Sequence, residues 1–361
     1  MELDEMEPAD LKLDGLDLEE LELEELDLAE KVGASLSFQD DLGDEFAELE
    51  ELEGETAETE REPTRADRIA YPPSPNNMPV DNVVVDRKMD SFVPSEFIRL
   101  LGKKSIVELR LGDHLKREMT IFFSDIRKFT EIFESISPEE GFRFINSYFT
   151  RVVPIINQYG GFVDKYIGDA IMAIFPQSNG ADMAVRAAVE IQKQIREYNK
   201  HRANTGYRPL NVGIGIHTGP IILGVVGTHN RMQNTVISDA VNLASRIEGL
   251  TKAFGVAMAI SGQTFRKLEH PEKYMFRYLG NVRVKGKNEP TSVYEILNGI
   301  DEALLEKKMM TSRDFEQGLF SFALRKYYDA LDNFNRVLSI IPEDRASTVY
   351  SERCQKHLKG A

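Results

Sequence analysis

Hydrophobic and polar residues follow a regular pattern through the middle of the chain, from Lys116 to about Leu297. Short apolar runs alternate there with longer stretches in which apolar residues recur at helical spacing. The periodic stretches predict helices at 137–158, 180–200 and 239–254. The runs predict strands at 118–124, 161–166, 170–175, 210–218, 221–227, 256–260, 276–284 and 291–296. This order favours an α+β fold, an open sheet covered by helices on one face and built on a βαββαβ core.

The two ends of the chain have different patterns. Residues 1–85 alternate Leu with Asp and Glu and then pass through a proline-bearing stretch, which predicts a disordered acidic tail and a linker. The Leu spacing is also compatible with a transient amphipathic helix that docks a partner protein. Residues 86–115 predict a helical connector, residues 116–300 the main folded domain, and residues 301–361 a short α-helical C-terminus.

The C-terminal segment carries the spacing of one tetratricopeptide repeat. Gly318 is followed by Ala330, Phe334 and Pro342 at offsets of 12, 16 and 24 residues. A generic helical hairpin is the alternative interpretation. A single repeat cannot bury both of its faces, so we expect this segment to pack on the main domain or on another subunit, and it is a candidate site for a protein partner.

Composition narrows the function classes. The net charge of −16 is concentrated in residues 1–62, which hold 26 acidic and three basic side chains, so the rest of the chain carries +7. A mildly basic body suits an anionic small substrate, and the acidic tail argues against nucleic acid as a partner. Cys354 is the single cysteine, which excludes an intramolecular disulfide and suits a reducing cytoplasm. No apolar run approaches about 18 residues, so neither a membrane span nor a secretion signal is expected.

Two aspartates are the first candidates for chemistry. Asp125 and Asp169 lie 44 positions apart, and each is expected to close an apolar strand and to be followed by a turn. Either residue alone could simply cap a helix, because Asp is a preferred N-cap residue. Together, two carboxylates at adjacent strand ends can hold two Mg²⁺ ions, with the backbone carbonyl of Ile126 as a further ligand. Such hard oxygen ligands would also accept Mn²⁺.

Four segments in order, FFSDIRKFT, DKYIGDAIMAIF, NTVISDAVNLASR and VRVKGKNEP, give the chain a resemblance to class III nucleotidyl cyclases over residues 90–300. The resemblance implies that Asp125 and Asp169 bind both metal ions. It also implies that the turn after Asp125, including Phe129 and Thr130, offers backbone amides to phosphate oxygens.

Two residues further along are four positions apart, so on a helix Asn242 and Arg246 face the same way. The resemblance makes Asn242 a ligand near the ribose and Arg246 the cation that stabilises charge growing on the α-phosphate. It matches Lys285 to the lysine that holds the triphosphate, with Lys287 as the alternative register and Arg231 as a weaker candidate for a phosphate contact.

Base selection depends on Lys165 and Thr235. Adenine presents an acceptor at N1 and a donor at N6, which an ammonium and a hydroxyl complement, whereas guanine reverses both. The pair resembles the Lys–Thr subgroup of these cyclases, which uses ATP. Two neighbours depart from the family pattern, because Asn234 stands where many relatives carry Tyr and Ser238 replaces a Gly. A position that required φ > 0 would strain Ser238.

The resemblance implies a homodimeric adenylate cyclase in signal transduction, which converts ATP to 3′,5′-cyclic AMP and pyrophosphate with two Mg²⁺ ions per site. The metal aspartates of one protomer would face a set of residues from the other: Lys165, Thr235, Asn242, Arg246 and Lys285. Two alternatives remain open. One is a guanylate cyclase of the same fold, and the other is a catalytically silent nucleotide-sensing module whose tail or repeat recruits a partner.

Overall fold

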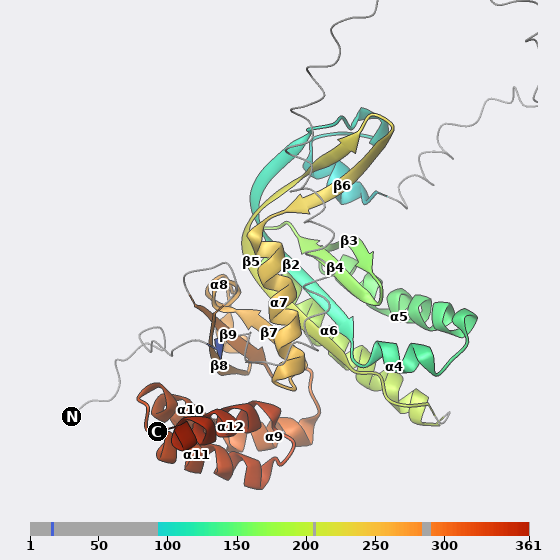
Figure 1. Cartoon of the computed structure of the whole chain (residues 1–361). Helices are drawn as coiled ribbons and strands as arrows, with labels where there is room; N and C mark the ends of the chain where they lie inside the picture. Colours follow the sequence, from blue (N-terminus) through green and yellow to red (C-terminus); the bar gives the residue numbers. More distant parts are fainter. Residues whose placement is uncertain (1–15, 18–92, 205–206, 284–289, 361) are drawn as a thin grey trace, which may run out of the picture.

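The computed structural model describes residues 16–17, 93–204, 207–283 and 290–360. Within them lies a nine-stranded sheet of order β1-β8-β9-β7-β5-β2-β4-β3, with β6 paired to β5 (Figure 1). The strands are β1 (Leu16–Asp17), β2 (His114–Ile126), β3 (Phe162–Ile167), β4 (Ala170–Phe175), β5 (Val212–Thr228), β6 (Arg231–Ile237), β7 (Met258–Ser261), β8 (Phe276–Arg283) and β9 (Thr291–Ile296).

Helices connect these strands and follow them. The longer ones are α5 (Pro138–Gln158), α6 (Gly180–Asn204), α7 (Asp239–Ala253), α9 (Glu302–Met310), α10 (Ser312–Ala323), α11 (Tyr327–Ile340) and α12 (Arg345–Gly360). The short ones are α3 (Ser95–Leu100), α4 (Phe129–Glu134) and α8 (Gly262–Arg266), with 3₁₀ turns η4 (Ile106–Glu108) and η5 (Pro271–Lys273). Within the described residues, none of the helices is long and apolar enough to cross a membrane.

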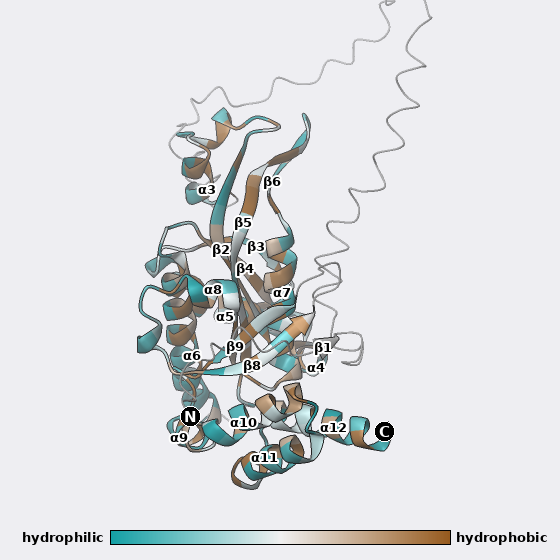
Figure 2. Ribbon diagram, turned by 90° about the vertical axis from the view of Figure 1, so that its left-hand side faces the viewer, coloured by the Kyte–Doolittle hydropathy of each residue, from teal (hydrophilic) through white to brown (hydrophobic). Residues whose placement is uncertain are grey.

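The predicted βαββαβ core is confirmed. Its elements follow in the order β2, α5, β3, β4, α6 and β5, and its strands lie side by side as β5-β2-β4-β3 with every neighbour antiparallel. Local signals explain the start of α5, since Ser137 and Glu140 form a capping box and Pro138 occupies the first turn. Hydrophilic and hydrophobic residues alternate along the helices that flank the sheet, as expected for helices with one buried side (Figure 2).

The prediction that helices cover one face only is wrong. Helices α5 and α6 pack on the face that carries Phe122 and Ile126 of β2. Helices α3 and α7 pack on the opposite face, which carries Ile121 and Phe123. The physical reason is visible in β4, whose residues Ala170–Phe175 are all buried, because a strand that is apolar on both sides needs cover on both sides.

One long strand replaces two predicted ones. The prediction placed a break between 210–218 and 221–227, but β5 runs continuously and pairs with β2 from Val212 to Gly224. Pro220 lies between the part of β5 that pairs with β7 and the part that pairs with β6. Proline is tolerated there because neither of these strands requires a hydrogen bond from its missing N–H. Strand β6 was not predicted; together with β5 it forms an arm that rises above the core (Figure 1).

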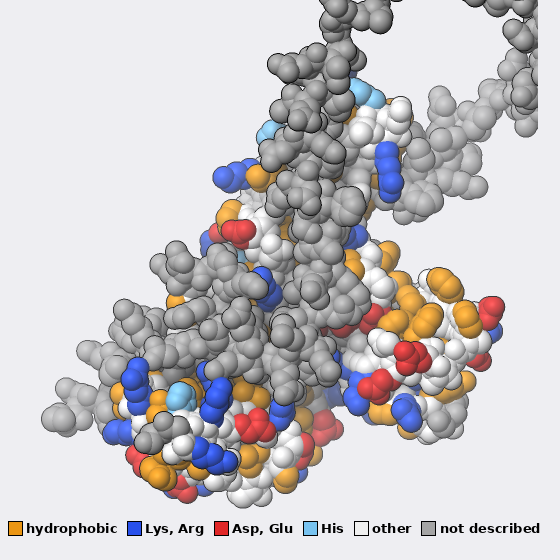
Figure 3. Space-filling view, in the orientation of Figure 1, with side chains coloured by type: hydrophobic (Ala, Val, Ile, Leu, Met, Phe, Trp, Pro, Cys, Tyr) orange, Lys and Arg blue, Asp and Glu red, His pale blue; other side chains and the backbone are white. Residues whose placement is uncertain are grey.

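The C-terminal segment is helical, as predicted, and it packs on the sheet and on α7. Phe315, Phe334 and Tyr350 are fully or almost fully buried in one cluster with Phe254, which caps the end of α7, and Leu279 of β8. Basic and acidic side chains are interspersed on the outer face of these helices (Figure 3). The close packing of α10 on α11 depends on Gly318, because a Cβ there would approach the Phe334 ring to 2.7 Å.

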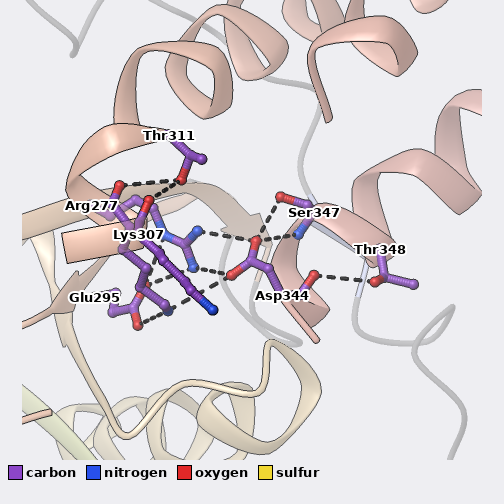
Figure 4. Close-up of polar contacts among 8 residues, drawn as sticks. Arg277, Glu295, Lys307, Thr311, Asp344, Ser347 and Thr348 are labelled. Atoms are coloured by element: carbon purple, nitrogen blue, oxygen red, sulfur yellow. Dashed lines mark hydrogen bonds and ion pairs between the residues drawn. The ribbon is translucent and has the colours of Figure 1, made fainter. Parts of the chain in front are cut away.

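A buried ionic network also joins the C-terminal helices to the sheet (Figure 4). Arg277 of β8 donates to Glu295 of β9 at 2.8 Å and to both oxygens of Asp344 at 2.9 and 3.1 Å. Lys308 of α9 lies 2.5 Å from Glu295, and Ser347 of α12 donates to Asp344. All four charged residues are at most 5% exposed. Two cations and two carboxylates therefore balance each other inside the protein.

Candidate active site

The two predicted metal aspartates lie together at one end of the core sheet. Asp125 lies near the end of β2, and the register that pairs Ser124 with Ile171 brings this end beside the start of β4. Asp169 lies in the turn directly before β4, so the prediction that it closes a strand is wrong. Its Oδ2 accepts a hydrogen bond from the backbone N–H of Ile126 at 3.1 Å.

The carboxylate pair is electrostatically strained. Burial, and next the neighbouring Asp125 carboxylate, raise the pKa of Asp169 to about 8. Two carboxylates this close cannot both ionise cheaply unless a cation shares them. Their hard oxygens suit Mg²⁺ or Mn²⁺. Among the described residues no group of three or more His, Cys, Asp or Glu side chains could hold a metal, so water and substrate oxygens would have to complete the coordination.

The turn after Asp125 leads directly into α4, which begins at Phe129 and Thr130. Lys128, the N-cap residue, has a left-handed φ of 57°, and its side chain forms no capping hydrogen bond. The Phe129 ring packs against Phe133 and Phe144, with ring centroids 5.4 and 6.4 Å apart. The Phe129 side chain thus packs against the core, which leaves its backbone amide as the group that could meet a phosphate, and that role stays a prediction.

Asn242 and Arg246 lie on α7. Most other residues of this helix are buried, either against the sheet or in the cluster that contains the C-terminal helices. Asn242 is exposed and Arg246 is half-buried. Burial lowers the pKa of Arg246, which nevertheless stays charged at neutral pH because an arginine starts from a pKa above 12. The helix therefore presents an amide and a permanent cation one turn apart.

The expected strain at Ser238 is absent. Its φ is −177°, an extended conformation that any residue adopts, so no glycine is needed there. Ser238 is instead the N-cap of α7, because its hydroxyl accepts from the Ala240 N–H at 2.9 Å and donates to the Pro220 carbonyl at 2.5 Å. The departure from the family pattern therefore helps to fix the start of the helix that carries Arg246.

Lys165 and Thr235 come from separate strands, β3 and β6. The Lys165 side chain is 31% exposed and Thr235 is 9% exposed. Sequence reasoning did not identify the residue that connects them, Asp164, to which Asn234 donates a hydrogen bond. Arg231 is exposed at the start of β6. Lys285 and Lys287 lie outside the described residues.

A cavity of about 690 Å³ lies elsewhere, between the α4–α5 segment and the C-terminal end of α6. It is lined by aromatic rings and by Arg143, Arg151, Arg202 and Arg208. None of the predicted site residues lines it. The hard oxygen ligands of Asp125 and Asp169 therefore lie outside this cavity.

Comparison with known proteins gives the family. Residues 113–298, more than half of the chain, match the model of the adenylate and guanylate cyclase catalytic domain. The chain belongs to this cyclase family. The class III cyclase resemblance and the mixed α/β cyclase fold are thereby confirmed, whereas the assignment to the Lys–Thr subgroup stays a prediction.

Named relatives of this cyclase include two adenylate cyclases. The chain is 35% identical over 304 residues to the terminal-differentiation specific adenylate cyclase of Dictyostelium discoideum, which covers 82% of this chain and 14% of the relative. It is 43% identical over 212 residues to an adenylate cyclase of Anabaena cylindrica, a match that covers 57% of this chain and 42% of the relative. The chain thus spans less than half of each relative's length.

Among solved structures, the cyclase resembles a bacterial light-regulated adenylyl cyclase with a TM-score of 0.54. The two are 27% identical, and the match covers 64% of this chain and 67% of the other. Members of this cyclase family generally use divalent metal ions, which agrees with the donor set of Asp125 and Asp169.

Proposed function

We propose that this chain is an adenylate cyclase that acts in signal transduction and converts ATP to 3′,5′-cyclic AMP and pyrophosphate. The observation that carries the proposal is the pair of close carboxylates, Asp125 and Asp169, at the end of β2 and the start of β4 in a cyclase fold. The choice of ATP rests on Lys165 and Thr235, whose donors and acceptors complement adenine. The named adenylate cyclase relatives support the same choice.

The reaction is an in-line displacement. The 3′-oxygen of ATP forms a bond to the α-phosphorus, the bond to the bridging oxygen breaks, and pyrophosphate leaves while the hydroxyl proton passes to solvent. Divalent cations held by Asp125, Asp169 and the Ile126 carbonyl would supply positive charge beside the phosphates and acidify the hydroxyl. Arg246 stabilises charge on the α-phosphate, and Asn242 orients the ribose.

We further propose that the active unit is a homodimer. The carboxylates lie on β2 and the β3–β4 turn, whereas the base-facing and phosphate-facing residues lie on β3, β6 and α7. A site shared between two chains would use one group from each protomer, and twofold symmetry would then produce two equivalent sites.

Complementation tests both the residues and the dimer. Asp125→Asn and Arg246→Ala, each assayed alone as the full chain with ATP and Mg²⁺, should produce almost no cyclic AMP. An equal mixture that is allowed to exchange subunits should regain about a quarter of wild-type activity, because half of the dimers are mixed and each has one intact site. No recovery would place the whole site within one chain, and full activity of either variant would refute its assignment. Parallel assays with GTP and with Mn²⁺ decide the base and the metal.

A further inference from the structure

Asp164 is a buried acidic residue next to one of the proposed base-recognising residues. Its side chain has 0% exposed surface, and it lies in β3 immediately before Lys165. Burying a carboxylate is costly unless it is paired or hydrogen-bonded. The contacts of Asp164 therefore indicate what it does.

The register of β3 explains how Asp164 reaches the interior. Val163 pairs with Ala173 and Lys165 pairs with Met172, so Asp164 is an extra residue in a β-bulge. A bulge breaks the strict alternation of a strand and re-aims the side chains around it. Consequently the Lys165 ammonium lies 3.5 Å from Asp164 Oδ2, although adjacent residues in a regular strand point to opposite faces.

The second oxygen of Asp164 accepts from another strand. Asn234 of β6 donates its side-chain N–H to Asp164 Oδ1 at 3.2 Å. Strand β6 folds back from β5 and lies near β3 in both ribbon views (Figures 1 and 2). The residues that follow Asp164 and Asn234 are Lys165 and Thr235, so this single contact sets the spacing between the two proposed base ligands.

The other carboxylate oxygen of Asp164, Oδ2, has a cation beside it but no hydrogen bond among the described residues. Asp164 Oδ2 is buried and has no hydrogen-bond partner within the described part of the chain. Burial raises the pKa of Asp164, while Lys165 and Asn234 act in the opposite direction. A buried carboxylate oxygen without a hydrogen bond attracts a cation, and the Lys165 ammonium is close enough to be held by Oδ2. The Lys165 side chain stays partly exposed, so its ammonium can also contact a ligand.

We propose that Asp164, anchored by Asn234, is a positioning residue that aims the Lys165 ammonium at N1 of the purine and thereby favours ATP over GTP. The inference rests on the proposed function of Lys165 and Thr235. Adenine N1 accepts a hydrogen bond, whereas guanine N1 carries a hydrogen and repels a fixed donor. A lysine released from Asp164 can shift to the guanine O6 acceptor. The preference for ATP over GTP then falls, mainly because the guanine nucleotide binds better.

Binding of unreactive nucleotides tests this inference on the full chain. 3′-DeoxyATP and 3′-deoxyGTP lack the attacking hydroxyl, so calorimetric titration of each with Mg²⁺ measures base preference without turnover. Asp164→Asn should reduce the wild-type preference for 3′-deoxyATP by about tenfold, the effect of one charge-assisted hydrogen bond. Asp332→Asn, the same change at an exposed residue of α11, should leave the preference unaltered. An unchanged preference in Asp164→Asn, with only a lower melting temperature, would reduce Asp164 to a structural residue.

A double-mutant cycle tests the role of Asn234. Asn234→Ala should weaken the preference alone but add little in the Asp164→Asn background, because it acts through Asp164. Independent losses would contradict this order of action, as would a wild-type chain with no preference between the two deoxynucleotides. Turnover is measured separately: a wild-type chain that forms no cyclic nucleotide overturns the proposed function, while the binding preference still decides the positioning inference.

Discussion

Replacing Arg277 by Met tests how firmly the C-terminal helices are attached to the cyclase domain. Met retains roughly the aliphatic stem of the arginine side chain but removes the guanidinium and its three charge-assisted hydrogen bonds, one to Glu295 and two to Asp344. It also removes the guanidinium that lies 4.3 Å from the centre of the Phe315 ring. After the substitution, two buried carboxylates face a single cation, Lys308.

The structure sets the expected size of the loss. Breaking a buried ion pair from one side costs about 3–5 kcal/mol, because the remaining charge stays buried without compensation. Arg277→Met should therefore lower the free energy of unfolding by about that amount. Adding Asp344→Asn restores the balance of one cation and one carboxylate, so the second change should cost about 2 kcal/mol less in this background than in the wild type. Exposed Arg336, which lies 2.5 Å from Asp332, is the matched control, and Arg336→Met should cost under about 1 kcal/mol.

Urea unfolding followed by circular dichroism and by tyrosine fluorescence measures these differences, since the chain contains no tryptophan. Burial raises the pKa of Asp344, but the Arg277 guanidinium outweighs burial and holds it below 3.8. The stabilisation is thus complete above pH 3.8 and is lost as pH falls through the lower folded-state pKa. In Arg277→Met the Asp344 carboxylate loses the cation that lowers its pKa and takes up a proton more readily, so the penalty should shrink between pH 7 and pH 4. A loss below about 1 kcal/mol at pH 7, or a penalty that does not change with pH, would refute this reasoning.

Two further predictions concern the contact between α7 and the sheet. Burial raises the pKa of Glu248 to about 7, with Arg127 opposing that shift and Asp125 adding to it, so this carboxylate contributes most stability below pH 4.5 and loses it as pH rises through 7. Glu248→Gln should therefore be more stable than the wild type at pH 8, by about 3 kcal/mol, and nearly equal to it at pH 4.5, as denaturant titrations at both pH values can show. Gly215→Ala should destabilise the fold by several kcal/mol because its Cβ would overlap the Glu248 backbone, whereas Gly249→Ala, with open space around it, should stabilise it by about 0.5–1 kcal/mol in thermal melts.

Local signals in the sequence predicted the elements that local interactions define. The start of α5 follows from Ser137 and Glu140, which cap it within one turn. The carboxylate pair was predicted because Asp125 and Asp169 lie in short, specific motifs, and the antiparallel register then brings them together. That Asp169 precedes its strand instead of closing one was a boundary error of a single turn, which leaves the pair intact.

Features that depend on pairing between distant segments could not be predicted in this way. The Gly-Pro sequence at Pro220 is typical of a turn, and only the continuous partner β2 shows that the strand passes through it. Strand β6 has a polar sequence, so its pairing with β5 is its main signal. Asp164 looked like an ordinary strand residue, because the bulge and the contact from Asn234 exist only in the assembled sheet.

Helix α7 connects the proposed phosphate-binding residue with the C-terminal helices. Its first half packs on β2 and β5 through Val241 and Ala244, and its second half packs through Leu250 and Phe254 into the cluster that contains the C-terminal helices. Arg246 lies between these two halves. Coupling between distant sites needs a packed element with two discrete arrangements, and the tight approach of α7 to the sheet favours a single one. The C-terminal helices are therefore best understood as a rigid support that holds α7, and with it Arg246, at a fixed height above the sheet.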